Sequence, residues 1–153
     1  MELDRGGPCS MDKELLKQKV CATIDAYADK IEEISNSIGD EPELGFKEVK
    51  TAAKVADFMR DLGLDPQTGL AINGVKARAH GGKPGPTAAV LGELDAVGCP
   101  ESCKADPLTG AAHACGHNLQ IATMLGAACG IMKSGVLSEL AGCILWCSCG
   151  RIH

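Results

Sequence analysis

The sequence predicts a single α/β domain, and two observations carry this prediction. Segments in which apolar residues recur at helical spacing alternate with apolar runs too short for helices, in the order helix, helix, strands, helix, strand. The 153 residues suffice for one hydrophobic core, and 45% of them are hydrophobic and 23% charged, which is ordinary for a globular protein. No internal repeat and no linker divides the sequence into domains.

The first predicted helix covers residues 13–38. Its apolar side chains are spaced by three and four positions, so they share one side of the helix: Leu16, Val20, Ile24, Tyr27, Ile31, Ile34 and Ile38. Gly39 follows as a natural stop. Residues 1–12 are expected to form a loose leader, in which Ser10 and Asp12 are the candidate caps of the helix.

Two kinds of element are predicted in the middle of the chain. A second helix is expected at residues 47–62, and a β-like segment follows at 72–79. Residues 87–94 are mostly apolar without alternation, which predicts a strand buried on both faces. A loop rich in Pro, Gly and Cys is expected at 98–110.

The third predicted helix covers residues 118–133. It is apolar nearly all round, so we expect it to be sandwiched inside a larger body. A last strand is expected at 142–147, and residues 148–153 form an atypical tail.

Charge and cysteine content narrow the class of protein. The formal net charge of -5, without any run of Lys or Arg, argues against a nucleic-acid partner. No apolar stretch reaches the roughly 20 residues that span a bilayer, and no secretory signal is present, so we expect a cytoplasmic protein without a membrane partner. The nine cysteines are then expected to be thiols or metal ligands. The absence of a C-x-x-C pair counts against a thiol redox protein, and the oligomeric state stays open.

One candidate site lies at the end of the strand expected at 87–94. Glu93 and Asp95 follow the apolar run there, and ligands in α/β sheets bind outside the carboxyl ends of strands. These carboxylates are therefore candidates to bind a metal or to orient a ligand. The alternative is structural, with Asp95 capping a turn and Glu93 pointing to solvent.

A second candidate site lies directly before the third helix. Cys115 and His117 are two residues apart around Gly116, which lets the backbone bend so that both side chains can converge on a cation. Thiolate and imidazole are the ligand types of zinc, and the helix N-terminus favours the thiolate. The alternative is a turn with a spare cysteine and two surface histidines, His113 and His117. Asp95 would support an imidazole of this site from behind.

Four segments together resemble a known family. They are EPELGFKEVKTA (41–52), GELDAV (92–97), ADPLTGAAHACGHN (105–118) and QIATMLGAA (120–128). In this order and at about this separation they are similar to the amidohydrolase branch of the aminoacylase/carboxypeptidase zinc-peptidase superfamily. That branch includes hippurate hydrolase, indole-acetyl-amino-acid hydrolases and aminobenzoyl-glutamate hydrolase. The resemblance covers roughly residues 13–142.

The resemblance implies a fold and an activity. The expected fold is the amino-terminal part of a three-layer α/β/α catalytic domain, with residues 13–147 as the partial domain. The implied activity is hydrolysis of the amide bond of N-acyl-amino acids or small aryl amides with two divalent metal ions, Zn by preference and Mn, Co or Ni as alternatives. Cys115 and His117 fall on the metal-ligand motif and Asp95 on the acidic position, whereas Glu93 stands where the branch often has Asp.

The chain also departs from the family pattern. The general-base glutamate of the family follows the strand after the third helix, but no acid follows Glu139 here, and the later histidine ligands and the lid or dimerisation domain have no counterpart. We therefore expect this chain alone to be catalytically incomplete, and the alternative is a non-catalytic metal-binding or interaction fragment. The tail allows a small metal cluster of Cys143, Cys147, Cys149 and His153, but an out-of-frame peptide that happens to contain cysteines is the favoured explanation.

Overall fold

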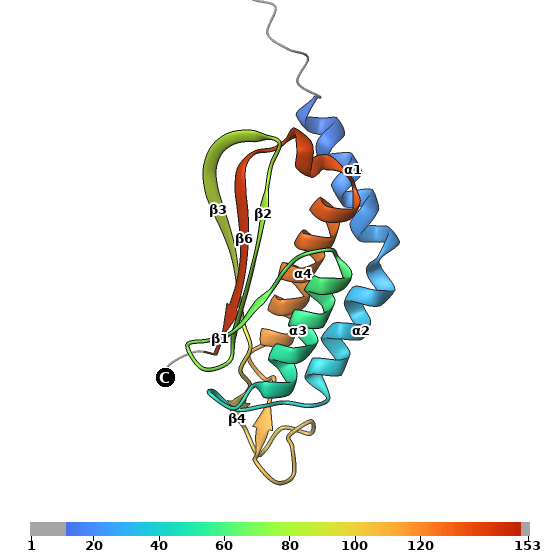
Figure 1. Ribbon diagram of the computed structural model, residues 1–153. Helices are drawn as coiled ribbons and strands as arrows, with labels where there is room; N and C mark the ends of the chain where they lie inside the picture. Colours follow the sequence, from blue (N-terminus) through green and yellow to red (C-terminus); the bar gives the residue numbers. More distant parts are fainter. Residues whose placement is uncertain (1–11, 151–153) are drawn as a thin grey trace, which may run out of the picture.

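A computed structural model describes residues 12–150 of the chain. The helices are α1 (Lys13–Ala26), α2 (Ala28–Gly39), α3 (Val49–Asp61), α4 (His117–Lys133) and the short 3₁₀ helix η1 (Val136–Glu139). The strands are β1 (Gln67–Leu70), β2 (Gly74–His80), β3 (Lys83–Glu93), β4 (Val97–Gly98), β5 (Ala111–Ala112) and β6 (Ala141–Cys149). The α/β class predicted from the sequence is confirmed (Figure 1).

The main sheet has the strand order β1-β2-β6-β3. β6, the last strand, lies between two strands that are neighbours in sequence, and pairs antiparallel with β2 and parallel with β3. The two-residue strands β4 and β5 form a separate antiparallel pair. β1, β4 and β5 are too short to have produced a periodic signal in the sequence, whereas the strands expected at 72–79 and 142–147 correspond to β2 and β6.

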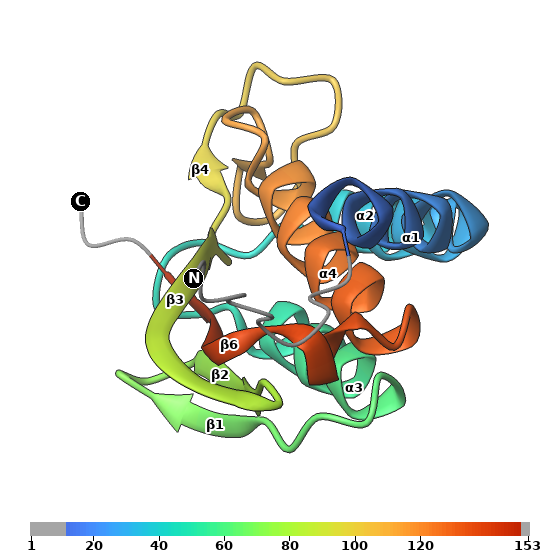
Figure 2. The ribbon, with the colours of Figure 1, turned by 90° about the horizontal axis from the view of Figure 1, so that it is seen from above.

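The helices lie on one face of this sheet in two tiers. α3 and α4 lie next to the sheet, and α1 and α2 pack on the outer side of α4 (Figures 1 and 2). Because α4 contacts strands on one side and helices on the other, most of its apolar residues are buried, as the sequence predicts, although Leu119 in its first turn is exposed. Among the described residues, no helix covers the opposite face of the sheet.

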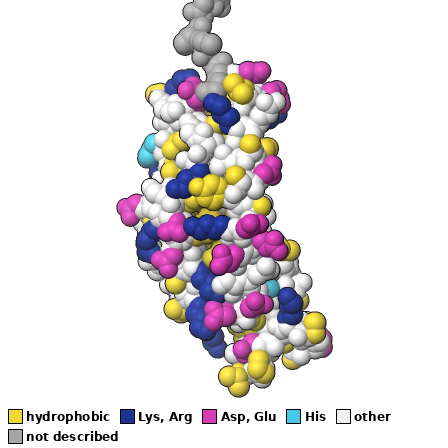
Figure 3. Space-filling model, turned by 90° about the vertical axis from the view of Figure 1, so that its right-hand side faces the viewer, with side chains coloured by type: hydrophobic (Ala, Val, Ile, Leu, Met, Phe, Trp, Pro, Cys, Tyr) yellow, Lys and Arg dark blue, Asp and Glu magenta, His cyan; other side chains and the backbone are white. Residues whose placement is uncertain are grey.

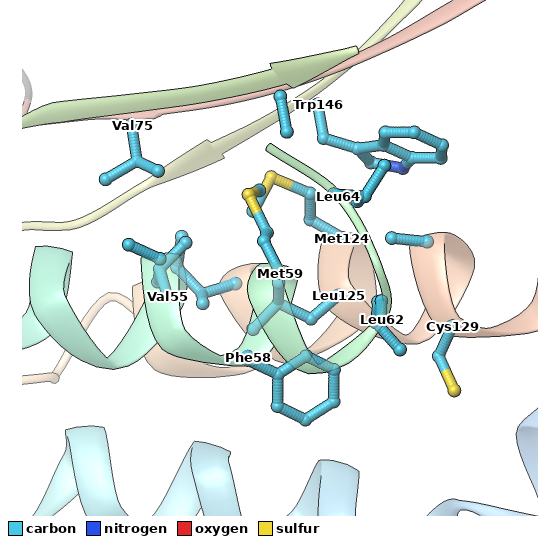
Figure 4. Close-up of a cluster of buried hydrophobic side chains, with 14 of the residues drawn as sticks. Val55, Phe58, Met59, Leu62, Leu64, Val75, Met124, Leu125, Cys129 and Trp146 are labelled. Atoms are coloured by element: carbon cyan, nitrogen blue, oxygen red, sulfur yellow. The ribbon is translucent and has the colours of Figure 1, made fainter. Parts of the chain in front are cut away.

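The core fills the space between the sheet and the inner helices. Met59 of α3, Leu125 of α4 and Trp146 of β6 are all essentially inaccessible to solvent, and they point into one cluster (Figure 4). Phe58 lies on the side of this cluster nearer the outer helices. Despite the scarcity of aromatic residues, the largest buried side chain is therefore the tryptophan of the last strand.

The single helix expected at 13–38 is two helices. The chain bends at Tyr27, whose φ of -108° and ψ of 10° leave the helical region. The Tyr27 amide donates to both Thr23 O at 3.2 Å and Ile24 O at 3.0 Å, so the turn tightens locally without losing its hydrogen bonds. The predicted apolar stripe nonetheless continues, because Val20 and Ile24 before the bend and Ile31 after it all approach α4.

The prediction that the strand at 87–94 is buried on both faces is wrong. β3 is an edge strand, and most of its residues are exposed, including Leu91 at 68%. Its inner face touches α4 only near the carboxyl end, where Gly92 is buried. The apolar composition of β3 therefore reflects a surface that the described residues leave uncovered.

The outer surface of the helices is polar. Acidic and basic side chains are interspersed over this outer face of the helices (Figure 3), and some form ion pairs, such as Lys30 of α2 with Asp61 of α3 at 2.8 Å. This pattern is typical of a solvated face. Within residues 12–150, no helix combines the length and hydrophobicity needed to cross a membrane.

Candidate metal centre

The candidate site begins where β3 ends. After Glu93 the main chain is fixed by two hydrogen bonds, from Leu94 N to Cys149 O at 3.1 Å and from Ala96 N to Glu43 O at 2.7 Å. Asp95, between these anchors, is completely buried. The strand end therefore presents a carboxylate in a fixed and water-poor position.

The second part of the site is the entrance to α4. Gly116 is the N-cap residue and has a φ of 77°, a left-handed conformation that glycine adopts without strain. No side chain caps this helix. This conformation turns the chain and places His117, 7% exposed, beside the strand end, whereas the convergence of Cys115 and His117 on one cation stays a prediction.

His117 lies between the two carboxylates of the strand end. Its Nδ1 is 2.7 Å from the main-chain oxygen of Asp95 and 3.4 Å from Asp95 Oδ1. Its Nε2 is 3.0 Å from Glu93 Oε2. A carbonyl oxygen only accepts, so Nδ1 carries a hydrogen and donates it, and Nε2 faces the Glu93 carboxylate.

Cys115 lies on the outer side of the same turn. Its side chain is exposed and lines a cavity of about 420 Å³ together with His113. Within residues 12–150, no three His, Cys, Asp or Glu side chains are grouped closely enough to hold a metal ion. The donor types at this turn therefore fit a divalent cation, but they supply only part of the four ligands that zinc usually has.

The cluster proposed for the tail is not formed by its described members. Cys143 is buried, Cys147 is partly exposed and Cys149 is exposed, along one face of β6. The described cysteines are all free thiols. Burial is the main cause that raises the pKa of the Cys149 thiol, and the nearby Cys147 and Glu93 add to it. His153 lies outside the described residues.

The structure adds two residues to which the sequence assigned no functional role. Neither ring nitrogen of the partly buried His113 has a hydrogen-bond partner among the described residues, and burial, followed by the neighbouring His117, lowers its pKa. Glu48 is 1% exposed; its Oε2 accepts from Asn73 Nδ2 at 3.0 Å, and its Oε1 lies against Gly150. The only available signal was their position inside the segments 41–52 and 105–118.

The sequence is similar to those of known hydrolases. No family model matches the chain. Thermostable carboxypeptidase 2 of Saccharolobus solfataricus is 32% identical over 123 residues, which cover 78% of this chain and 31% of that protein. An IAA-amino acid hydrolase of Arabidopsis thaliana is 30% identical over 101 residues, which cover 64% of this chain and 22% of that protein.

A solved structure shares the fold. The YXEP protein of Bacillus subtilis, a dinuclear metal-binding peptidase of the M20 family, matches this chain with a TM-score of 0.71 at 24% identity. The match covers 81% of this chain and 35% of that protein. The chain therefore spans about a third, or less, of the length of the relatives it matches.

Proposed function

This chain belongs to the amidohydrolase branch of the aminoacylase and carboxypeptidase superfamily, and on that premise we propose that it carries part of the metal centre of an enzyme that hydrolyses amide bonds. The substrates we propose are N-acyl-amino acids and small aryl amides or peptides. A divalent metal requirement is consistent with the dinuclear metal-binding relative that shares its fold.

One observation carries the proposal. The Nδ1 of His117 donates to the Asp95 carbonyl at 2.7 Å, so the ring is fixed with Nε2, the atom that would bind a metal, facing Glu93 Oε2 at 3.0 Å. Metal-binding histidines are oriented in this way by a carbonyl or carboxylate on their other nitrogen. Asp95 thus acts as the supporting acid, and His117 and Cys115 as the ligands that this chain contributes.

Cys115, His117 and Asp95 have different roles in the proposed metal centre. The uncapped N-terminus of α4 favours Cys115 as the thiolate, since helix N-termini stabilise negative charge. The set of one thiolate and one imidazole favours Zn, although Mn, Co or Ni are accommodated by the same donors. If metal ions were held by these residues, they would polarise the amide carbonyl and lower the pKa of bound water. The buried Asp95 holds the His117 imidazole in a fixed orientation.

These 153 residues alone are proposed to be catalytically incomplete. The resemblance assigns the general base and further histidine ligands to positions without a counterpart in this sequence, which has no acid after Glu139. Two ligands and a supporting acid bind a metal weakly, and Asp95, engaged with His117, leaves the role of general base for the attacking water unassigned. We place the protein in the cytoplasm, where the Cys115 thiol stays reduced.

A zinc titration followed by an activity assay tests this function. We expect Cys115→Ala and His117→Ala each to weaken zinc binding by tenfold or more, which corresponds to a loss of at least about 1.4 kcal/mol of binding free energy. The exposed Cys21 on α1 offers the matched control Cys21→Ala, which should bind as the unmodified chain does. The zinc-loaded chain should not hydrolyse N-benzoylglycine. Equal zinc affinity in all variants would remove the ligand assignment, and metal-dependent turnover would refute the incompleteness.

A second candidate function is that of a non-catalytic interaction chain. The observation in its favour is the uncovered face of the sheet, where Leu91 of the edge strand β3 is 68% exposed. An edge strand with an apolar face is a ready site for pairing with another polypeptide. The two functions are compatible, because a complementing chain that covers this face could also bring the missing ligands.

A further inference from the structure

The cavity beside Cys115 has a composition that the metal centre does not explain. It lies between the loop after β4 and the entrance to α4, and its polar lining includes Ser102, Lys104, His113 and Asn118. Among the described residues that line it, none is Asp or Glu. In a protein of net charge -5, a cavity whose lining carries a cation and no carboxylate favours an anionic ligand.

The donors in this cavity are available to a ligand. Within residues 12–150 the Lys104 ammonium forms no ion pair, and only its main-chain N–H is engaged, donating to Ser102 Oγ at 3.3 Å. Among the same residues, the Ser102 hydroxyl accepts this hydrogen bond but donates none. Both nitrogens of His113 are buried without a partner, so an imidazole N–H is also left to donate.

The wall of the cavity is held in place from outside. Asn118 Nδ2 donates to Ser35 O of α2 at 3.3 Å and lies 3.4 Å from Ser35 Oγ, which ties the first turn of α4 to α2. The Gly110 carbonyl accepts from Cys99 N at 2.8 Å, and the Ala111 carbonyl accepts from Asp106 N at 2.8 Å. These two hydrogen bonds brace the loop. The site is therefore preformed rather than assembled around its ligand.

We propose that this cavity is the subsite for the free α-carboxylate of an N-acyl-amino acid, bound by Lys104 and Ser102 with His113 at its side. The inference rests on the proposed function and deepens it. An α-carboxylate is three bonds from the scissile carbonyl carbon, so the two groups must be held within one small cavity. Cys115 lines the same cavity as Lys104, which satisfies that requirement. Amides that lack the carboxylate are then poor ligands.

A matched pair of probes tests the subsite by binding rather than by turnover. N-benzoylglycine carries the carboxylate, and N-benzoylglycinamide replaces it with a neutral amide of similar size. Binding to the full chain is measured by isothermal titration or by nuclear magnetic resonance, with a chelator present so that no metal contributes. We expect N-benzoylglycine to bind at least about tenfold more tightly than its amide, as befits a charge-assisted hydrogen bond.

Variants then locate the charge. Lys104→Gln should weaken binding of N-benzoylglycine by about five- to tenfold and leave the amide unaffected, and Lys104→Arg should retain most of the affinity. Lys17→Gln is the control, because Lys17 is exposed on α1 and its ion pair among residues 12–150 is with Glu14. Acetate in a further titration shows whether a bare carboxylate suffices; much weaker binding of acetate supports recognition of the whole N-acyl-amino acid.

Each contrary result is informative. Equal affinity for acid and amide, no effect of Lys104→Gln, or no saturable binding of either probe overturns the subsite. Zinc titration of Lys104→Gln should match the unmodified chain, since Lys104 is not a proposed ligand. If the carboxylate binds but zinc does not, the subsite stands and the proposed function fails; if zinc binds but the carboxylate does not, only the subsite fails.

Discussion

At the scale of single residues, the site is built from side chains whose partners are mostly main-chain atoms. His117 is fixed by the Asp95 carbonyl, and the loop that carries Lys104 is fixed by Asp106. The sequence indicated that Asp95 supports an imidazole, and the structure brings these two residues together. It could not indicate that Glu93 lies 3.0 Å from the same ring, because that contact depends on how far β3 extends before the chain turns.

Asp106 provides a test of the loop. Its carboxylate accepts from Thr109 Oγ1 at 2.8 Å, Thr109 N at 2.7 Å and Leu108 N at 3.0 Å, and the Thr109 hydroxyl is the main cause that lowers its pKa. A lowered pKa in the folded state means that this stabilisation is present above the unfolded value, 3.8, and is lost as pH falls through the folded value.

We therefore expect Asp106→Ala to lower the thermal midpoint at pH 7 and to have little effect at a pH well below the folded value. Thermal unfolding at both pH values measures this, with the exposed Asp57→Ala on α3 as the control. A deficit of the same size at both pH values would show that the carboxylate charge is not what holds the turn.

At the scale of elements, the packing of α1 on α4 depends on a small residue. A Cβ at Gly130 would lie 2.8 Å from Ile24 Cγ1 and 2.9 Å from Val20 Cγ1, closer than such contacts allow, whereas a Cβ at Gly126 would lie 3.4 Å from Ile31 Cδ1. The apolar stripe of residues 13–38 was predictable from its spacing. The bend at Tyr27 was not, because it arises from a local shift in hydrogen bonding that leaves the spacing intact.

The two glycines of α4 form a matched pair of variants. Gly130→Ala should destabilise the protein by about 1–3 kcal/mol, because the added methyl group overpacks the contact with α1. Gly126→Ala has room for its methyl group and gains helix propensity of about 1 kcal/mol at most, so it should be neutral or stabilising. Urea unfolding measures both. Equal effects of the two substitutions would show that α1 does not approach α4 closely in solution.

At the scale of the whole molecule, one face of the sheet is unfinished. Leu91 and Ala89 of β3 lie beside Cys147 and Leu145 of β6 on the side away from the helices. The sequence of β3 correctly predicted a strand, but its burial depends on what covers it, and the chain spans only about a third of its relatives. The apolar composition of β3 suits a strand that is covered on both faces. The prediction of burial was therefore wrong for the face of the sheet that the described residues leave open.

This exposed face should cause self-association. We expect the chain to associate at raised concentration and Leu91→Lys to reduce the association, because a charge on an edge strand opposes pairing. Leu15→Lys on α1, where the leucine is 43% exposed, is the control and should have no effect. Sedimentation velocity over a concentration series measures this. Association that is unchanged by Leu91→Lys would show that a surface other than β3 causes it.

The place of β6 in the sheet has a consequence for how the chain acquires its structure. β2 and β3 are joined by a short connection, yet they do not pair with each other, since β6 occupies the position between them. During synthesis the ribosome releases β2 and β3 long before β6, so the gap between them stays open until nearly all described residues have emerged. Such late, distant pairing slows folding and lengthens the period in which nascent strands are open to chaperones.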